Sequence, residues 1–184
     1  MRAIPGMTVL MPSDAYESEA AVRAAARSPG PFYIALADGR PEPPGARSFR
    51  IGRAVLRRPG RDLCLLSTGA LLSEALLAAD ALGERGISAR VLAFPTLKPI
   101  DREAVRAAAA ECGLLLAVEE HSVIGGLGSA VAEILAEEGL GPRFRRLGLP
   151  DRFLALGGTR AHYRARLGLD AAGIAAEAAR LLGG

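Results

Sequence analysis

The stretch "DLCLLSTGALLSEALLAADALGERGISARVLAFP", residues 62–95, decides the fold of this chain. It begins with a continuous apolar run at 62–69, which is typical of a strand that is buried on both faces. The amphipathic segment 71–86 follows and ends at Gly86, a residue suited to closing a helix. A second apolar run, 88–95, predicts another buried strand, so the order strand, helix, strand indicates a parallel α/β sheet.

The same alternation continues to the end of the chain. The predicted elements are a helix at 101–112 capped by Asp101, a strand at 113–120, a helix at 125–139, a strand at 143–150, and closing helices at 159–168 and 170–184. Residues 49–60 alternate and predict an edge strand or a hairpin arm. We therefore expect residues 49–184 to form a complete three-layer α/β/α domain with a mostly parallel sheet of about five strands.

The first 40 residues predict a separate and smaller unit. A strand at 7–12, a helix at 13–28 and a strand at 30–37 make one βαβ unit, which is too small to form its own core. We expect residues 1–40 to be the C-terminal remnant of a second α/β domain. Residues 41–48, rich in Pro and Gly, are expected to be the linker. The rest of that domain is expected in another chain or in sequence missing from the start.

Composition narrows the class of protein. Hydrophobic residues make up 50% and aromatic residues only 4%, so the core must be mostly Ala, Leu, Val and Ile. The net charge is +3 without a lysine-rich tract, which argues against a nucleic-acid partner. No apolar run approaches the ~18–20 residues of a membrane helix, and no signal peptide is visible. Cys64 and Cys112 lie in apolar contexts and are expected to be buried thiols, so we expect a cytoplasmic protein with no membrane partner.

One loop carries most of the polar signal. In "VEEHSVIGGLGS", residues 118–129, an apolar strand ends at Glu120 and His121, and Gly126 and Gly128 then lead into a helix. Such a loop can bind an anion at the helix start, and a histidine beside carboxylates can act as an acid or base. The glycines match neither GxGxxG nor a Walker loop. We therefore favour a tight turn with a charged rim, or an interface, and keep the anion site as the alternative.

Asp14, in "PSDAYE", is the sharpest candidate for a functional carboxylate. It follows the first predicted strand, and ligands bind at the carboxyl ends of parallel strands. It is equally placed to cap the following helix. The turn "STGA", residues 67–70, is a weaker candidate for a small-anion site, and the absence of a GxSxG motif disfavours a serine hydrolase.

Together these segments resemble the transketolase family. "RAIPGMTVLMPSDAYESEAAVRAAARSPGPFYIAL" is similar to the end of the pyrimidine-binding domain, and residues 49–101 are similar to the start of the transketolase C-terminal domain. "VEEHSVIGGLGSAVAEILAEEG" and "LGLPDRFLALG" continue the match. The resemblance is to the two-subunit type of bacteria and archaea. Deoxyxylulose-phosphate synthases and the β subunits of 2-oxo acid dehydrogenases share the architecture.

The resemblance implies an enzyme of the pentose phosphate pathway that moves a two-carbon ketol unit between sugar phosphates. It implies thiamine diphosphate and Mg²⁺, held in the complete enzyme by an N-terminal subunit or portion. This chain alone is therefore expected to be inactive and to bind neither. Asp14 would contact the substrate hydroxyl next to the reacting carbon. The family's phosphate-binding arginine is expected near Ala37 or Asp38; Arg40 is displaced, so either it takes that role from a shifted loop or phosphate is held differently.

The expected partners follow from the same resemblance. They are the N-terminal transketolase subunit or portion and a second copy of this chain, bound through the C-terminal domain. Glu120, His121, Gly126 and Gly128 would then belong to a structural turn and interface rim. Two other functions stay open: a non-catalytic assembly module, and a binder of small anions or nucleotides.

Overall fold

The main sheet has the architecture that the sequence predicts. A computed structural model describes residues 1–36, 48–154 and 157–183. The strands lie in the order β3 (Val55–Arg58), β5 (Ala89–Ala93), β4 (Leu63–Ser67), β7 (Leu114–Ser122) and β8 (Arg143–Leu149). β3 is an edge strand antiparallel to β5, and the other neighbouring strands are parallel. The prediction of a mostly parallel sheet with about five strands is confirmed.

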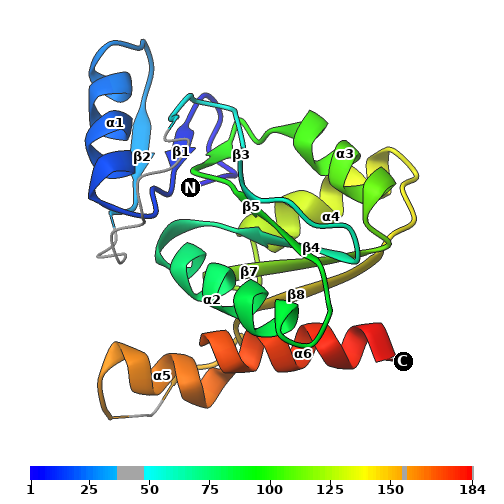
Figure 1. Ribbon diagram of the computed structural model, residues 1–184. Helices are drawn as coiled ribbons and strands as arrows, with labels where there is room; N and C mark the ends of the chain where they lie inside the picture. The colour runs from blue at the N-terminus through cyan, green and yellow to red at the C-terminus, as the bar shows by residue number, and fades with distance from the viewer. Residues whose placement is uncertain (37–47, 155–156, 184) are drawn as a thin grey trace.

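Helices cover both faces of this sheet (Figure 1). α2 (Leu72–Gly83), preceded by the 3-10 turn η1 (Gly69–Leu71), and α6 (Ala171–Gly183) pack on one face, and α3 (Arg102–Glu111) and α4 (Leu127–Glu137) pack on the other. Leu65 and Leu116 face the first pair, whereas their neighbours Leu66 and Leu115 face the second. Because successive strand residues point to opposite faces, this alternation explains why residues 63–66 of β4 and 114–118 of β7 form continuous apolar runs.

The predicted helix ends are also found. Asp101 caps α3 by accepting the N–H of Ala104 at 3.1 Å, and its other oxygen accepts the N–H of Ala54 at 2.9 Å. Gly86 has φ +77, and the next residue, Ile87, donates its N–H to the Leu82 carbonyl at 3.0 Å. This bond closes the chain just after α2, as expected for a glycine in the left-handed region.

The N-terminal unit is a βαβ unit, as predicted, but it has a third strand. β1 (Thr8–Leu10) and β2 (Phe32–Ile34) are parallel, and α1 (Ala15–Ala26) connects them. β6 (Thr96–Lys98) pairs antiparallel with β1 and comes from the segment after β5. The sequence pattern does not predict β6, because three residues between two prolines are too few to show an alternation of apolar and polar residues.

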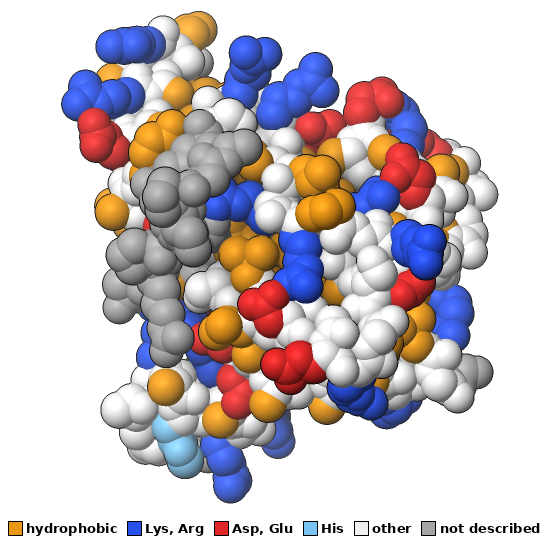
Figure 2. All heavy atoms as spheres, in the orientation of Figure 1, with side chains coloured by type: hydrophobic (Ala, Val, Ile, Leu, Met, Phe, Trp, Pro, Cys, Tyr) orange, Lys and Arg blue, Asp and Glu red, His pale blue; other side chains and the backbone are white. Residues whose placement is uncertain are grey.

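This unit shares part of its core with the main domain. Val9 of β1 is buried with Leu97 and with side chains of α3 and α4. Other apolar side chains stay exposed, including Val22 at 49% and Leu36 at 65%, and Figure 2 shows orange side chains on the upper-left part of the molecule, where Figure 1 places α1. Most of the predicted linker, 41–48, lies outside the described residues, so the domain boundary stays a prediction.

Two expectations from composition can be compared with the structure. Cys64 and Cys112 are both buried, as predicted, and a hydrogen bond between the two thiols, together with burial, raises the pKa of Cys64. Within the described ranges, no helix is long and apolar enough to cross a membrane.

Candidate functional site

The loop after β7 is organised around one buried carboxylate, that of Glu119. Its side chain is 1% exposed. Oε2 accepts the N–H of Leu127 at 2.7 Å, and Oε1 accepts the N–H of Gly128 at 2.9 Å. The first amides of a helix have no partner within it, and a negative charge is favourable there. Glu119 therefore caps α4 from the end of the preceding strand.

The two predicted glycines make room for this arrangement. A Cβ at Gly126 would lie 1.8 Å from Oε2 of Glu119, and one at Gly128 would lie 2.6 Å from Cγ of Arg146. Burial raises the pKa of Glu119, and the hydrogen bonds from Gly128 and Leu127 offset only part of that rise. The helix start thus binds an anion, but the anion is the chain's own carboxylate, and a second anion in the same place would be repelled.

Glu120 points to α5 (Arg160–Leu167) instead. Its Oε1 accepts a hydrogen bond from Nε of Arg160 at 2.7 Å, and its Oε2 accepts one from Nε of Arg164 at 3.0 Å. Burial acts to raise the pKa of Glu120, but the hydrogen bonds from the two guanidinium groups outweigh it and lower the pKa overall. No residue of α5 is fully buried, so these ion pairs join the helix to the domain together with Leu167, which packs against the core.

His121 lies at the rim of a shallow hollow. Its ring is half exposed, and Nδ1 lies 2.8 Å from the Ser122 carbonyl oxygen. The hollow is also lined by Arg2, Ile124 and Glu133. A half-exposed ring at an open rim is poorly placed for proton transfer within this chain alone.

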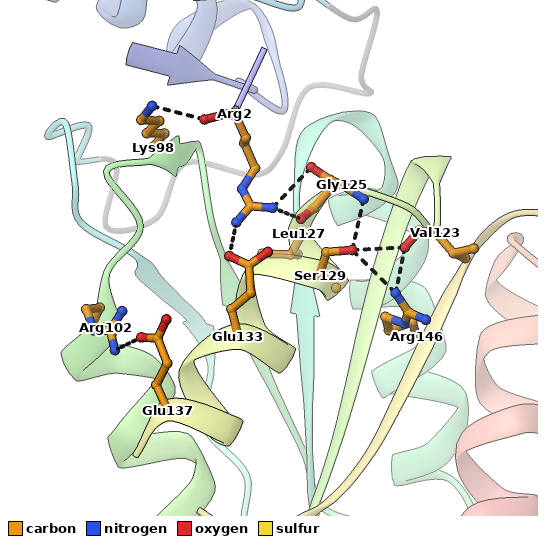
Figure 3. A network of polar contacts seen from close by, with 12 residues as sticks. Arg2, Lys98, Arg102, Val123, Gly125, Leu127, Ser129, Glu133, Glu137 and Arg146 are labelled. Carbon is orange, nitrogen blue, oxygen red and sulfur yellow. Dashed lines mark hydrogen bonds and ion pairs between the residues drawn. The ribbon is translucent and has the colours of Figure 1, made fainter. Parts of the chain in front are cut away.

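Arg2 joins the N-terminal segment to this loop (Figure 3). Its Nη1 donates to the carbonyl oxygens of Gly125 at 3.2 Å and Gly126 at 3.4 Å, and its Nη2 pairs with Glu133. Lys98 of β6 donates from Nζ to the Arg2 carbonyl at 3.0 Å. Sequence reasoning missed this contact because Arg2 and Gly125 lie 123 positions apart.

Asp14 caps α1, as the sequence allows. Its Oδ1 accepts the N–H of Glu17 at 2.8 Å. Glu17 in turn accepts both the N–H of Ser13 at 2.8 Å and the Ser13 hydroxyl at 2.7 Å, so the turn before α1 is held from both ends. The structure therefore places Asp14 at the N-cap of α1, just after β1, and the other four candidates at the end of β7 and the start of α4. Arg40 lies outside the described residues.

The described residues offer no metal centre of their own. Among them, no group of three or more His, Cys, Asp or Glu side chains is arranged to hold a metal ion. The glycine-rich helix start is filled by Glu119, so it does not fit the diphosphate of a cofactor. We derive no step through Mg²⁺ or a diphosphate on this chain.

Comparison with known proteins gives the family. Residues 52–174 match the profile described as the transketolase C-terminal domain. A 6-deoxy-6-sulfo-D-fructose transketolase subunit from Clostridium sp. is 44% identical and is matched over 85% of this chain and 49% of its own length. A 1-deoxy-D-xylulose-5-phosphate synthase from Geobacter sulfurreducens is 39% identical, matched over 96% of this chain and 28% of its own length. This chain thus spans about half or less of these relatives.

A solved structure resembles the whole chain. It is described as a split gene transketolase, an inactive beta4 tetramer, and it is 37% identical with a TM-score of 0.92. The match covers 100% of this chain and 60% of that one. The sequence, the three-layer fold and these matches agree, and the chain belongs to the transketolase family, whose C-terminal domain it carries.

Proposed function

We propose that this chain is the C-terminal part of a thiamine diphosphate-dependent transketolase-like enzyme that transfers a two-carbon ketol unit between sugar phosphates. The observation that carries the proposal is the extent of the match. The whole chain superposes on a chain of a split gene transketolase yet covers only 60% of it. We therefore infer that an N-terminal subunit or portion completes the enzyme and that this chain alone is inactive.

Thiamine diphosphate and Mg²⁺ would be held by that N-terminal part. When bound there, the cofactor supplies the carbanion stabilisation that cleavage and formation of the carbon–carbon bond require. The residues of this chain would bind and orient the substrate. This division of roles agrees with the glycine-rich start of α4, whose backbone amides already bind Glu119 and so offer no place for a diphosphate.

Asp14 is the residue of this chain that we propose to contact substrate. Its carboxylate lies at the N-cap of α1, in the turn that follows β1, and Glu17 holds that turn through Ser13. Oε1 of Glu17 is buried and has no hydrogen-bond partner among the described residues. A buried carboxylate oxygen without a donor is costly, which suggests that the neighbourhood of this turn is completed by a group from the N-terminal part or the substrate.

The exposed apolar face of the N-terminal unit is the surface that we assign to the N-terminal part. Val22 and Leu36 line a shallow hollow together with Ser18 and Arg23. Tyr33, on the outer strand β2, is 39% exposed. A patch of this kind on a small sheet is typical of a surface that another segment covers.

The test is reconstitution. The purified chain is mixed with its candidate N-terminal subunit, thiamine diphosphate and Mg²⁺, and ketol transfer between sugar phosphates is measured. We expect activity only in the mixture, and about 10–100-fold lower kcat/KM for Asp14→Asn, because a hydrogen bond to a charged group is lost. Asp170→Asn is the matched control, because Asp170 caps a helix in the same way, by accepting the N–H of Gly173, but lies at the start of α6. A mixture that forms a complex but transfers no ketol unit would contradict the proposal.

Two specific observations support other candidates. The match to a 1-deoxy-D-xylulose-5-phosphate synthase covers 96% of this chain. The formation of 1-deoxy-D-xylulose 5-phosphate is therefore assayed in the same mixture. The solved relative is described as an inactive tetramer, which supports self-association of this chain through the C-terminal domain, with or without catalysis. Light scattering of the chain alone at micromolar concentration tests self-association separately from activity.

A further inference from the structure

The loop between β8 and α5 presents an unusually exposed aromatic side chain. Phe153 has a relative exposure of 104%, the highest of the large hydrophobic residues described. A single exposed apolar side chain is common by itself, but this one borders a hollow that includes three further apolar residues. The hollow measures about 450 Å³, and it is lined by Ser122, Leu149, Pro150, Asp151, Arg152, Phe153 and Leu154. We call these seven residues the 149–154 surface.

The surface is built on the ordered ends of two strands. Ser122 of β7 is paired with Leu149 of β8, and Val123 donates its N–H to the Leu149 carbonyl at 3.0 Å. The Arg152 N–H donates to the Pro150 carbonyl at 2.8 Å, which turns the chain outward just before Phe153. The ring of Phe153 and the hollow therefore lie side by side at the paired ends of β7 and β8.

This combination fits a second copy of the same chain. A two-fold interface joins one surface to itself, so a projection must lie next to a recess that its equivalent can fill. Asp151 and Arg152 are adjacent, exposed and opposite in charge. Across a two-fold axis, Asp151 of each copy can face Arg152 of the other, which makes the charges self-complementary.

We propose that the 149–154 surface is the self-association interface of this chain, with Phe153 of each copy inserted into the hollow of the other. The inference rests on the self-association included in the proposed function and adds the surface and the residues that carry it. This surface shares no lining residue with the hollow on the N-terminal unit, which is lined by Ser18, Glu19, Val22, Arg23 and Leu36.

The first test compares two apolar positions by analytical ultracentrifugation of the purified chain. Phe153→Asp is expected to raise the dissociation constant about 30-fold or more, as for a buried aromatic at the centre of an interface. Leu36→Asp, on the N-terminal unit, is the matched control and is expected to leave the constant unchanged. Far-UV circular dichroism and the thermal midpoint verify that both variants fold.

The second test uses charge reversal. Asp151→Arg alone and Arg152→Asp alone each place like charges opposite one another, so each is expected to weaken association at least about 10-fold. The two single variants mixed together, and the double variant, restore opposite charges and are expected to recover the wild-type constant. A purely structural effect of either substitution would not be rescued by mixing.

The outcomes separate the two levels of inference. Suppose that the wild-type chain associates and that Leu36→Asp, but not Phe153→Asp, weakens the association. The assignment of the surface is then wrong, and the self-association stands. If wild type is a monomer up to ~100 μM, the surface assignment and the self-association both fail, since a Kd in that range corresponds to only about −5 kcal/mol. Ketol transfer in the reconstituted mixture is measured independently and is unaffected by either outcome.

Discussion

At the scale of single residues, Glu119 shows what a pattern can and cannot indicate. The sequence places two glutamates at the end of an apolar strand and glycines before a helix, which indicates an anion site, a tight turn or both. It does not reveal that Glu119 turns inward to the helix start while Glu120 turns outward to Arg160 and Arg164. That difference depends on strand alternation and on side chains far along the chain, so it appears only in three dimensions.

The close approach at Gly126 gives a direct prediction. Gly126→Ala places a Cβ where Oε2 of Glu119 lies, so the carboxylate must leave the amides of α4. We expect a loss of about 2–3 kcal/mol in the free energy of unfolding, measured by denaturant titration. Gly141→Ala is the control, because nothing lies within 4 Å of its Cβ and its φ is not positive. An equal effect of both variants would contradict the proposed role of the contact.

The lowered pKa of Glu120 predicts a pH-dependent contribution to stability. A carboxyl group whose pKa is lower in the folded state stabilises the fold above its ordinary value of 4.5, and this contribution is lost as the pH falls through the folded value. Glu120→Gln should therefore cost about 1–2 kcal/mol at pH 7. The difference from wild type should shrink below pH 4.5. Denaturant titrations across this range test the sign, with the exposed Glu84→Gln as control.

At the scale of elements, the long helices and strands could be predicted and the short ones could not. β4, β7 and α3 follow from clear apolar runs and from the Asp101 cap. β6 has three residues and exists because β1 offers it a partner, so its sequence carries no signal of its own. For α5, the sequence pattern predicts the helix but not the ion pairs that join Arg160 and Arg164 to Glu120.

The attachment of α5 can be measured by hydrogen exchange. Arg164 pairs with both Glu120 and Glu74, and its side chain is 14% exposed. Arg164→Ala should speed amide exchange in α5 while the main sheet stays protected, because the ion pairs to Glu120 and Glu74 are lost and no residue of α5 is fully buried. Arg166→Ala, an exposed position on the same helix, is the control. Equal protection in both variants would show that the helix is held by something other than these pairs.

At the scale of the whole molecule, the sequence predicts two units, and the structure shows that they share a core. The prediction came from the small size of the βαβ unit, and that reasoning is sound for the unit by itself. It could not anticipate that β6 would join the smaller sheet, that Val9 would pack with α3 and α4, or that Arg2 would bind the loop before α4. These contacts all connect positions distant in sequence.

The shared core predicts a single unfolding transition. Val9→Ala should lower the midpoint of one cooperative thermal transition, with a loss of about 2 kcal/mol, because Val9 is 3% exposed in the common core. Val22→Ala makes the same chemical change on the exposed face of α1 and should have little effect. Calorimetry decides: if Val9→Ala splits the transition in two, the units unfold independently.

The pairing of β1 with β6 also fixes an order of events during translation. β1 leaves the ribosome among the first residues of this chain, but the strand beside it is made only after α2 and β5. Until β6 is made, the edge of β1 that it will occupy stays unpaired and accessible to chaperones or to neighbouring nascent chains. Nascent chains whose residues 96–98 are still inside the ribosome should be cut readily by protease near β1, and nascent chains from which all residues up to 184 have emerged should not.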